Sequence, residues 1–127
     1  MTVSSKTFVA WEGTTPTLMT RVVADDDGLV IVQADVASIA KIVNLASDGS
    51  VVVASAALTV SAVVYDTLQT DARWKLDTTG YNFAHQLAVT DLPTGAVTYV
   101  VQYQFTGSAG GVSIVEFKIQ TRENYHS

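Results

Sequence analysis

The sequence predicts an all-β fold in which two sheets pack on a shared core. Valine and threonine, which are β-branched and favour extended backbone, supply 20 and 16 of the 127 residues. Turn residues recur at short intervals, and two segments near the C-terminus alternate strictly between apolar and polar side chains. Because no linker-like segment or internal repeat interrupts the chain, we expect residues 1–127 to form one domain.

Composition also narrows the classes of function. The net charge is −5, and the seven lysines and arginines are scattered, which argues against a nucleic-acid surface. The absence of cysteine excludes a disulfide framework and a thiolate metal site. The first residues lack the apolar core of a secretory signal, and no apolar run approaches the ~20 residues of a membrane helix. We therefore expect a soluble protein that folds in the cytoplasm.

Short strands are expected in the first third of the chain. Candidates lie at residues 6–11, 18–23 and 29–33, and the segments GTTP and ADDDG supply turns between them. Asp35 is a candidate N-cap for one short helical turn that would precede a strand near residues 39–45.

The middle of the chain carries a mixed signal. Ser-Asp-Gly at 47–49 predicts a turn before a strand at 51–54. Apolar residues at 60, 63, 64 and 68 then follow helical spacing behind Ser61, a candidate N-cap. This pattern predicts a short helix over 61–68, with a bent strand as the alternative.

The C-terminal segments 97–105 and 112–121 give the clearest prediction. Period-two alternation makes each a strand with one buried and one solvent-facing side, and the glycine-rich TGSAGG between them predicts a hairpin. The expected inward-facing residues are Tyr99, Val101, Tyr103 and Phe105 on the first strand and Val115, Phe117 and Ile119 on the second.

The segment 77–99 contains a candidate catalytic set, His85 with Asp77 or Asp91 and a nearby hydroxyl. Nucleophilic catalysis requires an oriented imidazole, a nucleophile and an oxyanion hole. The chain has no G-x-S-x-G motif, and the other histidine, His126, is next to the last residue. We therefore predict no catalytic residues and no enzymatic activity.

Metal and cofactor sites are equally incomplete. The carboxylates of Asp25, Asp26 and Asp27 precede a glycine, but a calcium loop needs alternating ligands and a closing glutamate. Three adjacent aspartates at a turn are more typical of a solvated loop tip. Gly110-Gly111 lacks the glycine spacing and the helix of a phosphate-binding loop. We expect no metal and no cofactor.

Aromatic residues near this segment have two interpretations. Trp74, Tyr81 and Phe83 could form a platform for a sugar or peptide, but large aromatics in small domains mostly pack in the core. Core packing is the favoured interpretation.

A corner motif refines the expected fold. Leu92-Pro93-Thr94-Gly95 followed by Tyr99 resembles the tyrosine corner of immunoglobulin and fibronectin-type sandwiches, in which the tyrosine hydroxyl bonds to upstream backbone. The cysteine pair of antibody domains is missing. The prediction is an immunoglobulin-like β-sandwich with one or two short helical turns.

The block 66–83, DTLQTDARWKLDTTGYNF, together with this corner and the C-terminal hairpin, resembles small virion proteins of tailed bacteriophages with immunoglobulin-like folds. It is also similar to the N-terminal sandwich domain of upper-baseplate proteins. The residues that carry the resemblance are Trp74, Asp77, Gly80, Tyr81, Asn82 and Phe83, joined by Leu92, Gly95 and Tyr99. The resemblance implies structural roles, with Trp74 and Phe83 in the core and Asp77 and Asn82 bonded to turn backbone.

The resemblance implies a non-enzymatic virion structural protein, made and assembled in the host cytoplasm. A capsid decoration or cement protein is favoured, with other virion proteins and further copies of the chain as partners and neither nucleic acid nor membrane among them. A tail or baseplate adaptor is one alternative. Another is a glycan- or peptide-binding module that uses Trp11 or residues 25–27. Residues 1–5 and 124–127 are candidate arms for intersubunit contacts.

Overall fold

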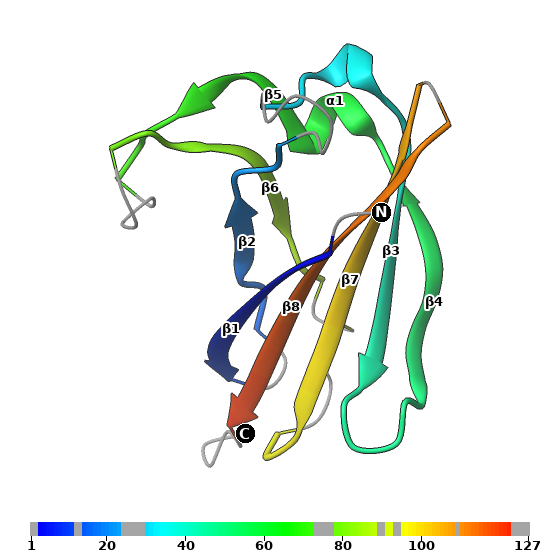
Figure 1. Cartoon of the computed structure of the whole chain (residues 1–127). Helices are drawn as coiled ribbons and strands as arrows, with labels where there is room; N and C mark the ends of the chain where they lie inside the picture. The colour runs from blue at the N-terminus through cyan, green and yellow to red at the C-terminus, as the bar shows by residue number, and fades with distance from the viewer. Residues whose placement is uncertain are drawn as a thin grey trace.

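A computed structural model describes residues 3–11, 14–23, 30–72, 78–88, 91–92, 95–108 and 110–122, with the backbone alone for 3–9 and 11. Within these residues eight strands and two single helical turns form an all-β fold, as the composition predicted (Figure 1). The elements are β1 (Val3–Trp11), β2 (Thr17–Thr20), η1 (Gln33–Asp35), β3 (Val36–Leu45), β4 (Val51–Leu58), α1 (Val60–Val63), β5 (Val64–Gln69), β6 (Tyr81–Gln86), β7 (Thr98–Gly107) and β8 (Val112–Arg122).

The strands form two sheets. The larger has the order β1-β8-β7-β3-β4, in which β1 runs parallel to β8 and the remaining neighbours are antiparallel. The smaller sheet is antiparallel and has the order β2-β6-β5. The chain alternates between the sheets, so strands that are adjacent in the sequence often lie in different layers (Figure 1). Among the described residues no helix is long and apolar enough to cross a membrane.

The C-terminal hairpin is confirmed. Strands β7 and β8 pair without interruption from Thr98 opposite Gln120 to Thr106 opposite Val112. All seven predicted inward-facing residues are buried, at no more than 3% exposure: Tyr99, Val101, Tyr103, Phe105, Val115, Phe117 and Ile119. The alternation along these strands therefore defines the inner face of the larger sheet.

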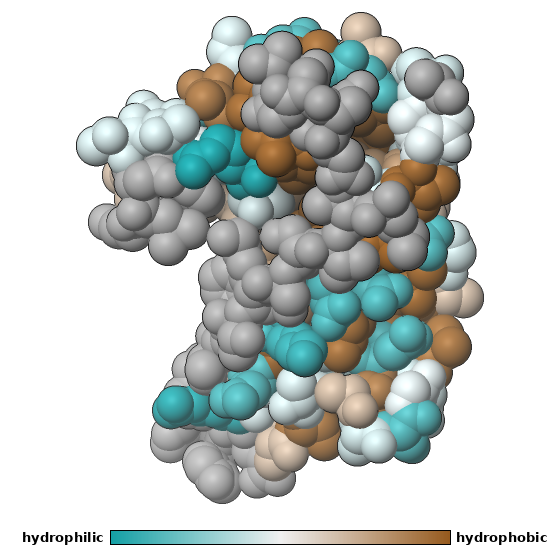
Figure 2. Space-filling model, in the orientation of Figure 1, coloured by the Kyte–Doolittle hydropathy of each residue, from teal (hydrophilic) through white to brown (hydrophobic). Residues whose placement is uncertain are grey.

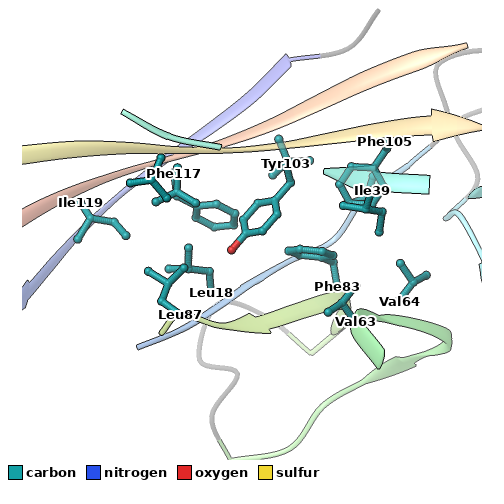
Figure 3. Close-up of a cluster of buried hydrophobic side chains, with 14 of the residues drawn as sticks. Leu18, Ile39, Val63, Val64, Phe83, Leu87, Tyr103, Phe105, Phe117 and Ile119 are labelled. Atoms are coloured by element: carbon teal, nitrogen blue, oxygen red, sulfur yellow. The ribbon is translucent and has the colours of Figure 1, made fainter. Parts of the chain in front are cut away.

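Aromatic rings join the two sheets at the centre of the core (Figure 3). Phe83 of β6 contacts Tyr103 and Phe105 of β7 edge to face, with ring centroids 4.8 and 5.3 Å apart. Tyr103 also packs edge to face on Phe117 of β8, at 5.9 Å. Such offset arrangements are favourable beyond the apolar area that they bury.

The predicted strand at 29–33 is wrong. Val30 takes part only in an isolated bridge to Val23, and Gln33 begins the 3-10 turn η1. The Asp35 carboxylate accepts a hydrogen bond from the Val32 N–H at 3.1 Å, which folds this segment into a turn. Asp35 therefore ends the helical turn, whereas the sequence suggested that it would cap the beginning of one.

The predicted helix over 61–68 is confirmed for one turn only. Helix α1 ends at Val63, and Val64 begins β5, where it pairs with Phe83. Ser61 is not the N-cap, because Thr59 occupies that position. The turn at 47–49 is confirmed by the Asp48 carboxylate, which accepts from the Ser50 N–H at 2.9 Å, and β4 continues four residues beyond the predicted strand.

Candidate functional site

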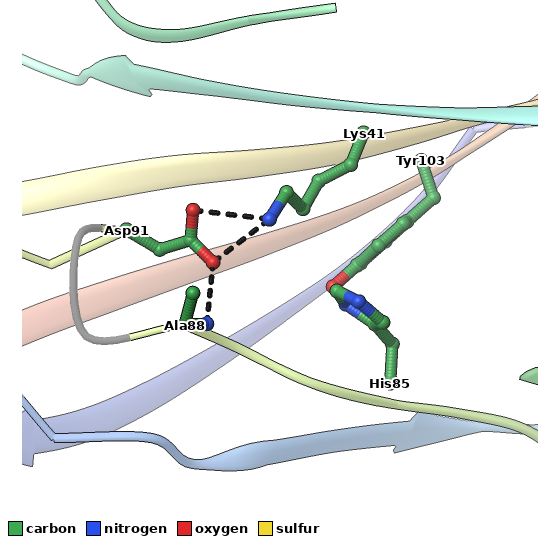
Figure 4. Close-up of polar contacts among 5 residues, drawn as sticks. All are labelled: Lys41, His85, Ala88, Asp91 and Tyr103. Atoms are coloured by element: carbon green, nitrogen blue, oxygen red, sulfur yellow. Dashed lines mark hydrogen bonds and ion pairs between the residues drawn. The ribbon is translucent and has the colours of Figure 1, made fainter. Parts of the chain in front are cut away.

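The structure brings four polar side chains together between the sheets (Figure 4). Lys41 of β3 and Tyr103 of β7 come from the larger sheet, and His85 comes from β6 of the smaller one. Asp91 lies in the connection between β6 and β7. We refer to Lys41, His85, Asp91 and Tyr103 as the inter-sheet polar cluster. Lys41, Asp91 and Tyr103 are buried, and His85 is half-buried. The cluster contains both the histidine and one of the aspartates of the candidate catalytic set.

Lys41 faces the core because of its position in β3. Its neighbours at two residues' distance, Ile39 and Val43, are 1% and 0% exposed, so the alternation of the strand points the lysine inward. The ammonium nitrogen Nζ lies 3.0 and 2.8 Å from the two carboxylate oxygens of Asp91. The two side chains are 9% and 2% exposed. A charge at this depth requires such a partner, because an isolated one is strongly destabilising.

Asp91 also fixes the connection that follows β6. Its Oδ2 accepts a hydrogen bond from the Ala88 N–H at 2.7 Å, while its own N–H donates to the Ala88 carbonyl at 3.0 Å. These reciprocal bonds close a tight turn, a geometry that aspartate favours. The carboxylate thus receives three donor contacts, two from Lys41 and one from backbone.

His85 and Tyr103 form the second half of the cluster. His85 Nδ1 lies 2.9 Å from the Tyr103 hydroxyl oxygen, and the rings meet edge to face at 5.5 Å. Burial and the nearby positive charge of Lys41 lower the pKa of His85, and Asp91 opposes this shift. Burial, and then the negative charge of Asp91, raise the pKa of Tyr103 well above its ordinary value. Both groups are therefore neutral at pH 7.

The bonds of the cluster join β3 to the β6–β7 connection and β6 to β7. In a catalytic triad the carboxylate orients the histidine, whereas here the bonds of Asp91 run to Lys41 and Ala88. The Nδ1 of His85 is bonded to Tyr103, which is 0% exposed. The four side chains therefore face one another inside the molecule, and the polar bonds of each are directed at the opposite sheet or at the turn.

Acidification tests the state of His85. Because its pKa in the folded protein is lowered, the unfolded chain binds more protons as the pH falls below the ordinary value of 6.5. We expect the free energy of unfolding to be constant above that pH and to decrease below it until the lowered pKa is reached. Urea unfolding followed between pH 7.5 and 5.5 measures the slope.

His85→Gln should flatten this slope, and His126→Gln, which removes the other histidine, is the matched control. A slope that is unchanged in His85→Gln, or a protein that becomes more stable on acidification, would contradict a neutral, half-buried His85.

Four residues of the predicted motif, Gly80 to Phe83, lie where β6 begins. Tyr81 and Phe83 are buried, and the Tyr81 hydroxyl donates to Asp71 at 2.6 Å. Gly80 has a φ of +105°, and a Cβ there would lie 2.5 Å from the Gln69 carbonyl oxygen. Only glycine fits this position. Trp74 and Asp77 lie outside the described residues.

Asn82 has a longer reach than the sequence suggested. Asn82 is 1% exposed, and its side-chain oxygen Oδ1 accepts a hydrogen bond from the Val22 N–H at 2.7 Å. Its side-chain nitrogen Nδ2 donates to the backbone carbonyls of Val22 and Ile31, both at 3.0 Å. The resemblance implied a bond to turn backbone, and the observed bonds of Asn82 join Val22 and Ile31, which are 60 and 51 residues away in the sequence. The aspartates at 25–27 lie between Val22 and Ile31 in the sequence, outside the described residues.

The corner residues are buried as a group. Leu92 is 0% exposed and Tyr99 is 1% exposed. Gly95, which lies between them in the sequence, is also buried. The Ala96 N–H donates to the Thr121 carbonyl at 3.0 Å, which ties this connection to β8. The predicted bond from the Tyr99 hydroxyl to upstream backbone remains a prediction.

Within the described part of the chain, no three histidine, cysteine, aspartate or glutamate side chains are grouped as a metal site would require. No family model and no curated protein matches the sequence.

Proposed function

We propose that the protein is a non-enzymatic structural protein of a tailed-bacteriophage virion, and that it decorates or cements the capsid. The observation that carries the proposal is that the polar side chains between the two sheets bond to one another. The candidate catalytic residues His85 and Asp91 bond to Tyr103 and Lys41 inside the fold. The resemblance of the block 66–83 to phage virion proteins supplies the specific role.

The proposed fold is an immunoglobulin-like sandwich, and the strand order supports it. In such domains strands C, F and G form one sheet and B, E and D the other, and variable-type domains add a strand beside C. Here β3, β7 and β8 take the first positions, β2, β6 and β5 the second, and β4 lies beside β3. Leu92 lies in the connection between β6 and β7, and Tyr99 is the second residue of β7, the position at which the tyrosine of such a corner is found.

One departure from antibody domains is chemical. Those domains place a buried tryptophan on strand C, against a disulfide. In this chain Lys41 faces inward from β3, and the sequence has no cysteine. The core of this chain thus contains a buried ion pair and has no disulfide.

The proposed partners are the major capsid protein and further copies of this chain on the particle. Decoration proteins of this kind are made and assembled in the host cytoplasm. Repetition over a symmetric shell gives many weak contacts a large combined effect.

Quantitative mass spectrometry of purified particles from the phage that encodes the chain, combined with antibody labelling, tests this proposal. We expect many copies per particle, in a number that matches capsid symmetry, and label on the head. A few copies confined to the tail or baseplate would establish the adaptor alternative instead. Absence from the particle would overturn a virion role, and saturable binding of a glycan or peptide by the isolated protein would then favour a ligand-binding module.

A further inference from the structure

Strand β4 leaves one edge of the larger sheet open. It pairs with β3 on one side, and among the described residues no strand pairs with its other side (Figure 1). In an antiparallel sheet about half of the N–H and C=O groups of an edge strand point away from its neighbour, where they can bond to another strand. Viewed from the same side, Figure 2 shows apolar surface at several places along the margin where β4 runs.

The other three edges carry features that discourage pairing. Strand β2 has only four residues, and β1 contains Lys6 in its sequence. Strand β5 is covered by η1, because Gln33 donates its amide to the Val64 carbonyl at 3.0 Å and its N–H to the Asp66 carboxylate at 2.8 Å. By contrast, β4 is eight residues long, contains no charge and no proline, and exposes Val51 to 64%.

The geometry of β4 limits where a partner strand could pair. The register with β3 shifts between Lys41 and Val43 and again between Val43 and Asn44, and such irregularities bend an edge strand. Residues 56–58 keep a regular register with residues 39–41. The stretch 54–57, Ala-Ser-Ala-Ala, has small side chains that lose little rotamer freedom on burial. The regular register and the small side chains coincide at Ala56 and Ala57, so a second strand is expected to pair around these two residues.

We propose that β4 pairs antiparallel with β4 of a second copy of this chain, so that the two larger sheets become continuous. Each copy has a net charge of −5, and β4 is an uncharged strand through which two copies can meet without placing like charges opposite each other. An isologous contact of this kind closes at two subunits and leaves no β4 edge open. The proposal is independent of the virion role, because a decoration protein can be monomeric.

Sedimentation equilibrium of the full chain, over a range of concentrations, tests for the dimer. Ser55→Lys and Ala57→Lys place a charge on exposed positions of β4 and should raise the dissociation constant by at least about tenfold. Gln120→Lys, an exposed position on β8, is the matched control and should leave the constant unchanged. Circular dichroism verifies that each variant is folded.

Cysteine cross-linking provides a second, direct test, because the chain has no cysteine of its own. A disulfide requires two Cα atoms about 4.4–6.8 Å apart, so a single cysteine links two copies only near the symmetry axis. We expect Ser55→Cys or Ala57→Cys to give a disulfide-linked dimer on mild oxidation, and Gln120→Cys to remain unlinked. A monomer at all concentrations, a dimer that both lysine variants leave intact, or cross-linking through Gln120→Cys alone would overturn the proposal.

Discussion

Asp91→Ala is expected to lower the free energy of unfolding by about 3–5 kcal/mol, the usual effect of removing one partner of a buried ion pair. The Lys41 ammonium would remain in the core without a carboxylate, because both of its bonds at 3.0 and 2.8 Å run to Asp91. The Ala88 N–H would lose its acceptor as well. Urea denaturation at pH 7 measures the change.

The double variant Lys41→Met/Asp91→Leu distinguishes the effect of the two charges from the effect of the volume that the two side chains fill. Replacing a buried pair by apolar side chains of similar size is often neutral or stabilising. We expect the double variant to recover most of the stability lost in Asp91→Ala. A single variant that loses less than about 1 kcal/mol, within the range of a solvent-exposed pair, would show that the pair is more exposed than the geometry indicates.

The outcome for Lys41 shows what could be predicted from the sequence and what could not. In SIAKIVN the lysine stands two residues from Ile39 and two from Val43, and period-two alternation places all three on one face. This local pattern predicts that Lys41 faces the core. The partner Asp91 lies 50 residues further along the chain, and no local pattern relates the two. The ion pair therefore depends on tertiary topology.

Prediction from local sequence patterns succeeded where the patterns agree with one another. The C-terminal hairpin was predicted because alternation and a glycine-rich turn agree over two long strands. Such patterns failed at 29–33, where a side-chain bond from Asp35 competes with strand pairing. At 60–68, Val63 and Val64 are both buried because the chain changes from a helical turn to a strand between them, and this change produces an apparent helical spacing.

Three polar residues of the described part of 77–99, His85, Asp91 and Asn82, bond to other segments of the fold. His85 bonds across to Tyr103, and Asp91 bonds across to Lys41. Asn82 bonds to a segment about 50 to 60 residues away. Each of these bonds joins two different segments of the chain, and those of His85 and Asp91 reach the larger sheet.

Asn82→Ala is expected to destabilise the fold by about 2–4 kcal/mol, because it leaves buried backbone groups without their side-chain partner. The Val22 N–H loses its acceptor at 2.7 Å, and the Ile31 carbonyl loses its donor at 3.0 Å. The Val22 carbonyl is less affected, since the Ile31 N–H continues to donate to it at 3.1 Å. Urea unfolding gives the magnitude.

Amide hydrogen exchange locates the effect. In the wild-type protein the Val22 N–H is held by the Asn82 side chain, so its exchange should accelerate in Asn82→Ala beyond the change that global stability imposes. Gln86→Ala is the matched control on the same strand, because its exposed amide makes only long bonds, at 3.3 and 3.2 Å, to the carbonyl and hydroxyl of Thr15, and it should cost less than about 0.5 kcal/mol. If the Val22 amide exchanged as slowly in Asn82→Ala as in the wild type, Asn82 would not be what holds Val22 and Ile31 against β6.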